Sequence, residues 1–102
     1  MLIGNTRNKP SLDTIRRIKF TLRVTLNLPE EAIVTVTQLA CLEDGCAPLE
    51  TVIGLLQPKQ PQLQFKIHKE TAAVNADDLK LVCDAWGFNI KITEIDKLFK
   101  ES

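Results

Sequence analysis

The fold is decided by residues 33–56, which read IVTVTQLACLEDGCAPLETVIGLL. Two runs rich in Val, Ile and Thr, residues 33–41 and 49–56, flank a loop that contains Asp44 and Gly45. An Asp-Gly pair between apolar runs is a strong hairpin signal, because a type I′ turn needs positive φ at both central residues. The sequence therefore predicts that the two runs form strands and pair antiparallel.

Two cysteines flank the predicted turn. Pro48 has no N–H to give to a neighbouring strand, so pairing is expected to begin at about Leu49 and to leave residues 42–48 as an exposed connection. Cys41 and Cys46 are then expected to lie near one another at one end of the sheet, with Cys46 the more accessible of the two.

A third strand follows a proline-bounded turn over residues 57–61. Leu63, Phe65 and Ile67 alternate with polar residues, which is typical of a strand with one buried face. Because the connections are short, we expect an antiparallel meander of three strands.

The segment before the hairpin fits two patterns. Ser11 is a good N-cap and Asp13 complements the helix dipole. Apolar residues then recur at helical spacing, as Leu12, Ile15, Ile18, Leu22 and Leu26. Residues 18–28 also alternate between apolar and polar, which is a strand pattern. We favour a helix, since the cap and the earlier spacing agree with it.

A further helix is predicted after the third strand. Asn75 is its N-cap, and Asp78 stands at the capping-box position. The apolar stripe of this helix consists of Leu79, Val82, Cys83 and Trp86. Gly87 can end the helix in the left-handed conformation, with Phe88 folding back on the last turn.

The chain is expected to form a single domain over residues 1–102. Residues 1–10 are predicted to be a flexible N-terminus, and residues 93–102 a weakly ordered C-terminal turn. The predicted fold class is α+β in the order α-β-β-β-α, a three-stranded antiparallel meander with the helices on one face.

Composition excludes several classes of protein. Thirteen basic and thirteen acidic residues cancel, so no net field attracts nucleic acid or an anionic membrane. No apolar run approaches the roughly 20 residues that a membrane-spanning helix needs, and the N-terminus lacks the apolar core of a signal peptide. The three cysteines, an odd number, fit a reducing compartment. We therefore expect a cytoplasmic protein.

Residues 36–53 contain the pattern T-x-L-x-C-x4-C-x-P-x-E-T and are followed by QFKIHK at residues 64–69. Together these segments resemble a family of small cyanobacterial and proteobacterial proteins of unassigned function. The resemblance extends over residues 11–82. It implies a bacterial cytoplasmic setting and supports the helix over residues 11–27, and it implies no activity.

The cysteines are the candidate chemical groups. Cys41 and Cys46 can form a reversible disulfide or supply two metal ligands, and with His68 and Cys83 they would complete a tetrahedral zinc site. The alternative is that these cysteines are small buried side chains, as cysteine often is. Three cysteines are too few for an iron–sulfur cluster. No cofactor is predicted, and zinc is the one that the sequence leaves open.

A cluster of basic residues suggests a second alternative, nucleic-acid binding. Its members are Arg16, Arg17, Lys19 and Arg23 on the first helix and Lys66 and Lys69 at the third strand. The chain is neutral, however, and lacks the interleaved aromatic residues that stack on bases. A solvated helix face is the better interpretation of these residues.

The leading hypothesis is a non-enzymatic interaction or accessory module with an unidentified protein partner. No motif places a nucleophile beside His68, and no glycine-rich loop could cradle a phosphate. The candidate interaction residues are Asp44, Gly45, Cys46 and Pro48, together with the face or edge of the sheet that the helices leave uncovered. The sequence leaves the oligomeric state open.

Overall fold

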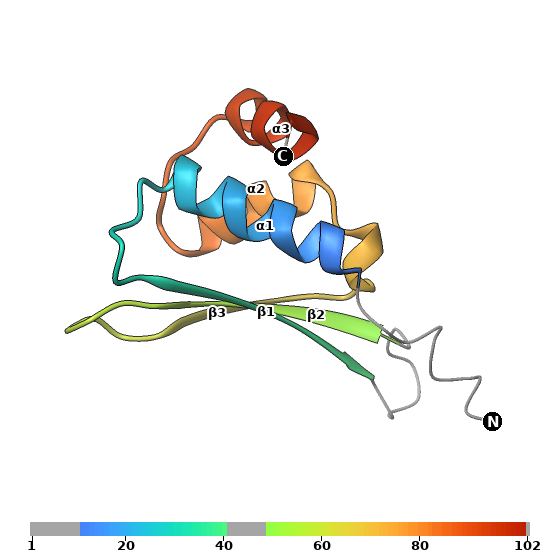
Figure 1. The fold of residues 1–102 in the computed structure, drawn as a ribbon, viewed down its shortest axis with the longest axis horizontal. Coiled ribbons are helices and arrows are strands. Elements are labelled where there is room, and N and C mark those ends of the chain that lie inside the picture. The colour runs from blue at the N-terminus through green and yellow to red at the C-terminus, as the bar shows by residue number, and fades with distance from the viewer. Residues whose placement is uncertain (1–10, 41–48, 102) are drawn as a thin grey trace.

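The structure is a computed structural model that describes residues 11–40 and 49–101. Its elements are α1 (Leu12–Thr25), β1 (Ile33–Ala40), β2 (Leu49–Leu56), β3 (Leu63–Ile67), the short 3₁₀ helix η2 (Thr71–Ala73), α2 (Ala76–Ala85) and α3 (Ile92–Glu101). Figure 1 shows α1 and α2 on one face of the sheet, with α3 beyond them. The predicted α+β fold is confirmed, with a third helix added.

The sheet is an antiparallel meander in the order β1-β2-β3. β1 and β2 pair from Ile33 opposite Leu56 to Ala40 opposite Leu49, so the pairing predicted from the sequence is confirmed. β3 pairs with the other side of β2 over residues 51–55. β2 is therefore the central strand, and β1 and β3 form the two edges.

Side chains on alternate positions of the strands point toward the helices and form the core. The buried side chains of the core include, from the sheet, Val34, Ile53, Leu55 and Ile67. From the helices they include Ile18, Leu22, Leu79, Val82 and Ile95. Burying one such side chain fully is worth roughly 1.5–3 kcal/mol. The core thus binds the sheet to the helices on one face alone.

α1 settles the ambiguity in favour of a helix over residues 18–25, and residues 26–28 form the cap that ends it. Ile18 and Leu22 are fully buried, four residues apart on one side of the helix. Phe20 and Val24, which a strand would have put on the same face as these two, are exposed. Packing of the helical face against the sheet outweighs the exposure of two apolar side chains.

The predicted helix caps are confirmed. The Ser11 hydroxyl accepts a hydrogen bond from the N–H of Thr14 at 3.2 Å. Asn75 and Asp78 form a reciprocal capping box at the start of α2. Gly87 follows the end of α2 with a φ of 90°, the left-handed conformation that glycine adopts without strain.

α1 and α2 end in the same motif with different residues. After α2 the N–H of Phe88 donates to the carbonyl oxygen of Cys83 at 2.9 Å, and after α1 the N–H of Leu28 donates to that of Arg23 at 3.0 Å. Asn27, with a φ of 51°, takes the place that Gly87 has in α2. Both are Schellman motifs, and asparagine is the usual alternative to glycine there.

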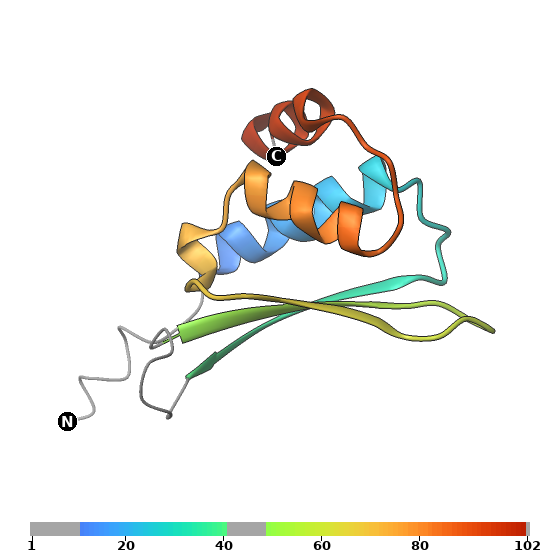
Figure 2. The same ribbon diagram turned by 180° about the vertical axis from the view of Figure 1, so that it is seen from behind.

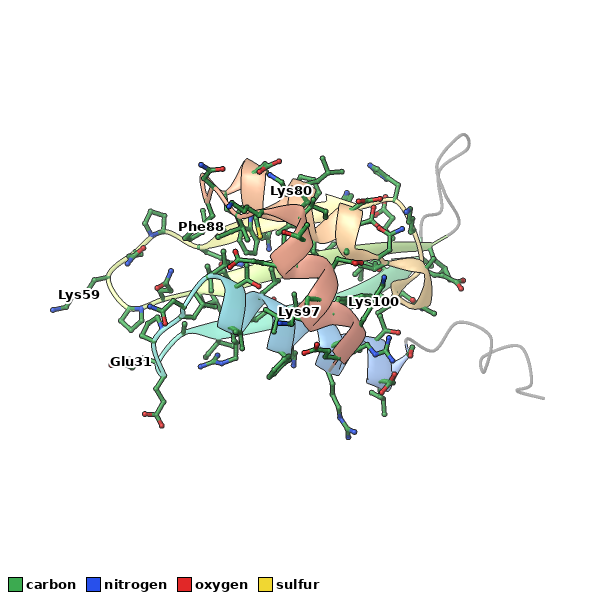
Figure 3. All side chains as sticks on the ribbon, turned by 90° about the horizontal axis from the view of Figure 1, so that it is seen from above. Glu31, Lys59, Lys80, Phe88, Lys97 and Lys100 are labelled. Atoms are coloured by element: carbon green, nitrogen blue, oxygen red, sulfur yellow. The ribbon has the colours of Figure 1, made fainter. Side chains whose placement is uncertain are left out.

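The C-terminal segment differs from the sequence-based expectation. A weakly ordered turn is predicted over residues 93–102, and the structure has instead a ten-residue helix, α3. Figure 3 shows α3 lying across the other helices, with Lys97 and Lys100 on it. Ile95 is fully buried where α3 packs against α1 and α2. A helix this short is marginal alone, so packing rather than local propensity accounts for it.

Candidate functional site

One face of the sheet carries no helix in the described part of the chain, as Figures 1 and 2 show from opposite sides. We name it the open face. Strand alternation places on it Ile33, Thr35, Thr37 and Leu39 from β1, Glu50, Val52, Gly54 and Leu56 from β2, and Gln64 and Lys66 from β3. Three of its large aliphatic side chains are exposed: Ile33 by 56%, Leu39 by 47% and Leu56 by 36%.

The half of the open face nearer β1 is apolar and flat. Ile33 lies directly opposite Leu56. Gly54 lies opposite Thr35, and a Cβ atom at Gly54 would come within 2.5 Å of the Thr35 hydroxyl oxygen. The glycine therefore leaves room for the threonine side chain and raises no side chain of its own above the sheet.

The end of the open face nearer β3 is charged. The carboxylate of Glu50, a residue only 8% exposed, lies 3.5 Å from Lys66 Nζ and 3.5 Å from His68 Nδ1. A buried carboxylate is costly unless it is paired, and these two side chains supply the partners. Glu50 could orient His68, but the serine and cysteine within the described residues, Ser11 and Cys83, both lie on the helical side.

The predicted zinc ligands are only partly described. Cys83 is fully buried in the core, whereas the His68 side chain is 66% exposed beside Glu50, so the structure does not bring these two together. Cys41 and Cys46 lie outside the described residues. Over residues 11–40 and 49–101, no group of three or more His, Cys, Asp or Glu side chains is placed to hold a metal ion.

Cys83 is an unreactive thiol by its surroundings. Burial raises its pKa from 9.0 to about 11, and the negative charge of Asp84 acts in the same direction. The thiolate is the nucleophilic and metal-binding form of cysteine. Cys83 therefore serves as a core side chain at neutral pH, as its place on the apolar stripe of α2 indicates.

The loop predicted to carry the interaction lies outside the described residues. This applies to Asp44, Gly45, Cys46 and Pro48 and to the predicted type I′ turn. The residues at both ends of the loop are described, and Ala40 opposite Leu49 is the last pair of β1 and β2 among the described residues. The start of pairing at Leu49 and the role of the loop stay predictions.

The basic residues do not form one continuous face. The four basic residues of α1 lie on the helix-covered side of the sheet, whereas Lys66 lies on the open face. Four of the six also contact partners within the fold, and these contacts are Arg17–Asp13 (3.4 Å), Arg23 with the carbonyl oxygen of Ala32 (2.8 Å), Lys66–Glu50 (3.5 Å) and Lys69–Asp78 (3.0 Å). Their roles within the fold weaken the interpretation as a nucleic-acid surface.

The surface of the described residues has hollows in two places of interest. One, of about 260 Å³, lies between β3 and α2 and is lined by Phe65, Lys66, Ile67, His68, Lys69, Asp78 and Leu81. The other, of about 370 Å³, lies between α1 and α3 and is lined by Val24, Thr25, Glu94, Lys97, Leu98 and Glu101. Both are open to solvent, whereas small-molecule sites bury most of their ligand.

The aliphatic residues of the open face are the part of the site that sequence reasoning missed. The sequence predicts that an uncovered face of the sheet can dock a partner, but it does not identify Ile33, Leu39 and Leu56 as the residues of that face. The signal for them was present, because β1 is apolar at Ile33 and Leu39 as well as at the alternate positions Val34 and Val36. A strand with apolar residues on both faces but a helix on only one must expose some of them.

No family of known proteins, no curated protein and no solved structure matches this chain. Among the helices of the described residues, none has both the length and the apolar character needed to cross a lipid bilayer. The family resemblance and the cytoplasmic setting accordingly stay predictions, and a proposal of function has to rest on the geometry of the sheet.

Proposed function

We propose that this protein is a non-enzymatic interaction module that docks a protein partner on the open face of its sheet. The observation that carries the proposal is the group of aliphatic side chains, Ile33, Leu39, Val52 and Leu56, on a face that no described helix covers. Large apolar side chains gathered on one face of a protein indicate an interaction surface.

The distribution of polarity on the open face defines the partner that would fit it. Interfaces commonly have an apolar centre and a polar rim. Here Val52 and Leu56 provide the centre, and Glu50, Lys66 and His68 form a charged rim at one end. The partner would present a flat apolar surface bordered by polar groups. The apolar surface would cover the aliphatic side chains, and the polar groups would fix the orientation of the partner more than its affinity.

The resemblance carried by the paired cysteines, with the Pro and Glu-Thr that follow them, supports a bacterial cytoplasmic setting for this function. The setting is consistent with a neutral chain that has no long apolar run. The partner is therefore sought in a bacterial cell extract.

The test removes the apolar centre of the open face without touching an edge strand. We expect a Val52→Lys/Leu56→Lys double variant to lose at least tenfold in affinity for a partner that the wild-type chain retains from native lysate, since charges then enter a desolvated interface. The matched control is Leu12→Lys/Leu81→Lys, which makes the same charge change at two exposed leucines on the helices. Thermal melting establishes that both variants fold.

Two results would contradict the proposal. In one, the open-face variant and the helix control retain the partner equally well. In the other, the wild-type chain retains no stoichiometric partner protein from native lysate.

A further inference from the structure

β1 is an edge strand whose own residues lack the features that usually protect an edge. It runs for eight residues, Ile33–Ala40, and contains neither a charged residue nor a proline. Within the described part of the chain, β2 is its one neighbouring strand. An edge strand directs the N–H and C=O groups of every second residue outward, where a further strand can pair with them.

The sequence of β1 is complementary to itself in one antiparallel register. A two-fold axis at Val36 places Ile33 opposite Leu39 of a second copy and Thr35 opposite its Thr37. The two large aliphatic side chains that are most exposed on the sheet, Ile33 and Leu39, then face one another. Moving the axis to Thr37 would instead pair Thr35 with Leu39 and leave Ile33 without an opposite residue in β1.

We propose that two copies of this chain pair antiparallel along β1, on a two-fold axis at Val36, and join their sheets into one of six strands. Aliphatic and β-branched residues facing one another across strands stabilise such pairs. The chain has no net charge, so no long-range repulsion opposes the approach of the copies. The pairing uses the edge of the sheet and does not depend on what docks on the open face.

The joined sheet would also extend the apolar area. Ile33 lies between Leu56 of its own chain and Leu39 of the second copy, so three aliphatic side chains form one row across the junction. The two-fold axis generates the same row a second time. A partner of the open face would then meet a surface about twice as wide as that of one chain.

The test uses charges at positions 35 and 37, which face each other only in this register. Sedimentation velocity over a dilution series should give the wild type a mass of twice its 11.4 kDa at high concentration. In T35K/T37K two pairs of like charges face across the axis, and in T35K/T37E the same two pairs are of opposite charge. We expect the dissociation constant of the first variant to exceed that of the second by about tenfold or more.

The control is Val52→Lys, which changes the open face on the central strand outside the row of Leu56, Ile33 and Leu39 and should leave the dimer intact. The proposal is overturned if the wild type stays at 11.4 kDa throughout, or if the two charge variants dimerise equally. It is also overturned if only the open-face variant dissociates the dimer, since the copies would then stack face to face. If the open-face variant loses the partner but still dimerises, the proposed function and this inference are shown to rest on different surfaces.

Discussion

The two edges of the sheet differ in how they meet solvent. β3 has five residues with Lys66 near its middle, follows a proline-bounded turn, and has the hollow against α2 beside it. β1 has eight residues and no charge. Short length, a lysine and flanking prolines are the devices by which proteins discourage strand pairing at an edge. The chain thus protects one edge and leaves the other suited to pairing.

The region around the protected edge also makes polar contacts within the fold. Lys69, just beyond β3, forms an ion pair with Asp78 of α2 at 3.0 Å. The buried hydroxyl of Thr51 donates to the carbonyl oxygen of Lys69 at 2.9 Å and lies 3.1 Å from the hydroxyl of Thr71. Polar groups near β3 are therefore used within the fold.

The largest expected effect comes from the residue that both edges share. Ile53 is fully buried on the central strand, opposite Val36 on one side and Phe65 on the other. Ile53→Ala should lower the free energy of unfolding by about 2–5 kcal/mol, measured by chemical denaturation. Val52→Ala, one position along on the open face, should cost less than half as much. Equal losses would mean that the open face is as tightly packed as the core.

A smaller loss of stability is expected for Gly54→Ala, and it should arise from contact with β1 and not with β3. A Cβ atom at Gly54 would come within 2.5 Å of the Thr35 hydroxyl oxygen, but 3.6 Å from the nearest atom of β3, the carbonyl oxygen of Leu63. Gly54→Ala should cost about 1–3 kcal/mol in unfolding free energy, because Thr35 must shift or rotate. The Gly54→Ala/Thr35→Ala double variant should recover most of that loss. A double variant with simply additive costs would contradict the contact.

Cys83, in the core on the helical side of the sheet, reports on the stability of the whole fold rather than on either edge. Its raised pKa means that the fold favours the neutral thiol. Below pH 9 the Cys83 thiol is neutral in both the folded and the unfolded chain, and its contribution to stability is fully present. Between pH 9 and about pH 11 the thiol ionises in the unfolded chain but not in the folded one. The free energy of unfolding should therefore decline over this range by at most about 1.4 kcal/mol per pH unit. The measurement is the pH dependence of urea unfolding, relative to Cys83→Ala. A parallel pH dependence in the two proteins would contradict the burial of this thiol.

The smallest effect on stability tests the protected edge. Lys66→Thr removes a charge from β3 and one of two partners from Glu50, and the unfolding free energy should change by less than about 1 kcal/mol because the lysine is exposed. The same variant should make β3 resemble β1, so light scattering should detect assemblies larger than a dimer. Lys80→Thr, which removes a lysine from α2, is the control. Assemblies no larger than those of the wild type would show that Lys66 does not protect the edge.

Local sequence signals accounted for much of the fold and little of the candidate site. The alternation in β1 and β3 and the caps at Ser11, Asn75 and Gly87 were predicted, because capping and turn chemistry depend on a few neighbouring residues. The pairing of Glu50 with His68 was not predicted. Those two residues lie 18 positions apart in the chain and meet only because the register of β2 and β3 sets them side by side.

The sequence by itself determined where strands and helix ends occur and which strands pair. Tertiary structure decided the rest. It removed the ambiguity over residues 18–25 in favour of the helix that the Ser11 cap already indicated, because Ile18 and Leu22 are buried against the sheet. It gave the C-terminal segment a helix through the burial of Ile95. It also determined which of the two faces of the sheet the described helices cover. Alternation assigns residues to two faces, but only long-range packing determines which face is covered and which is left open.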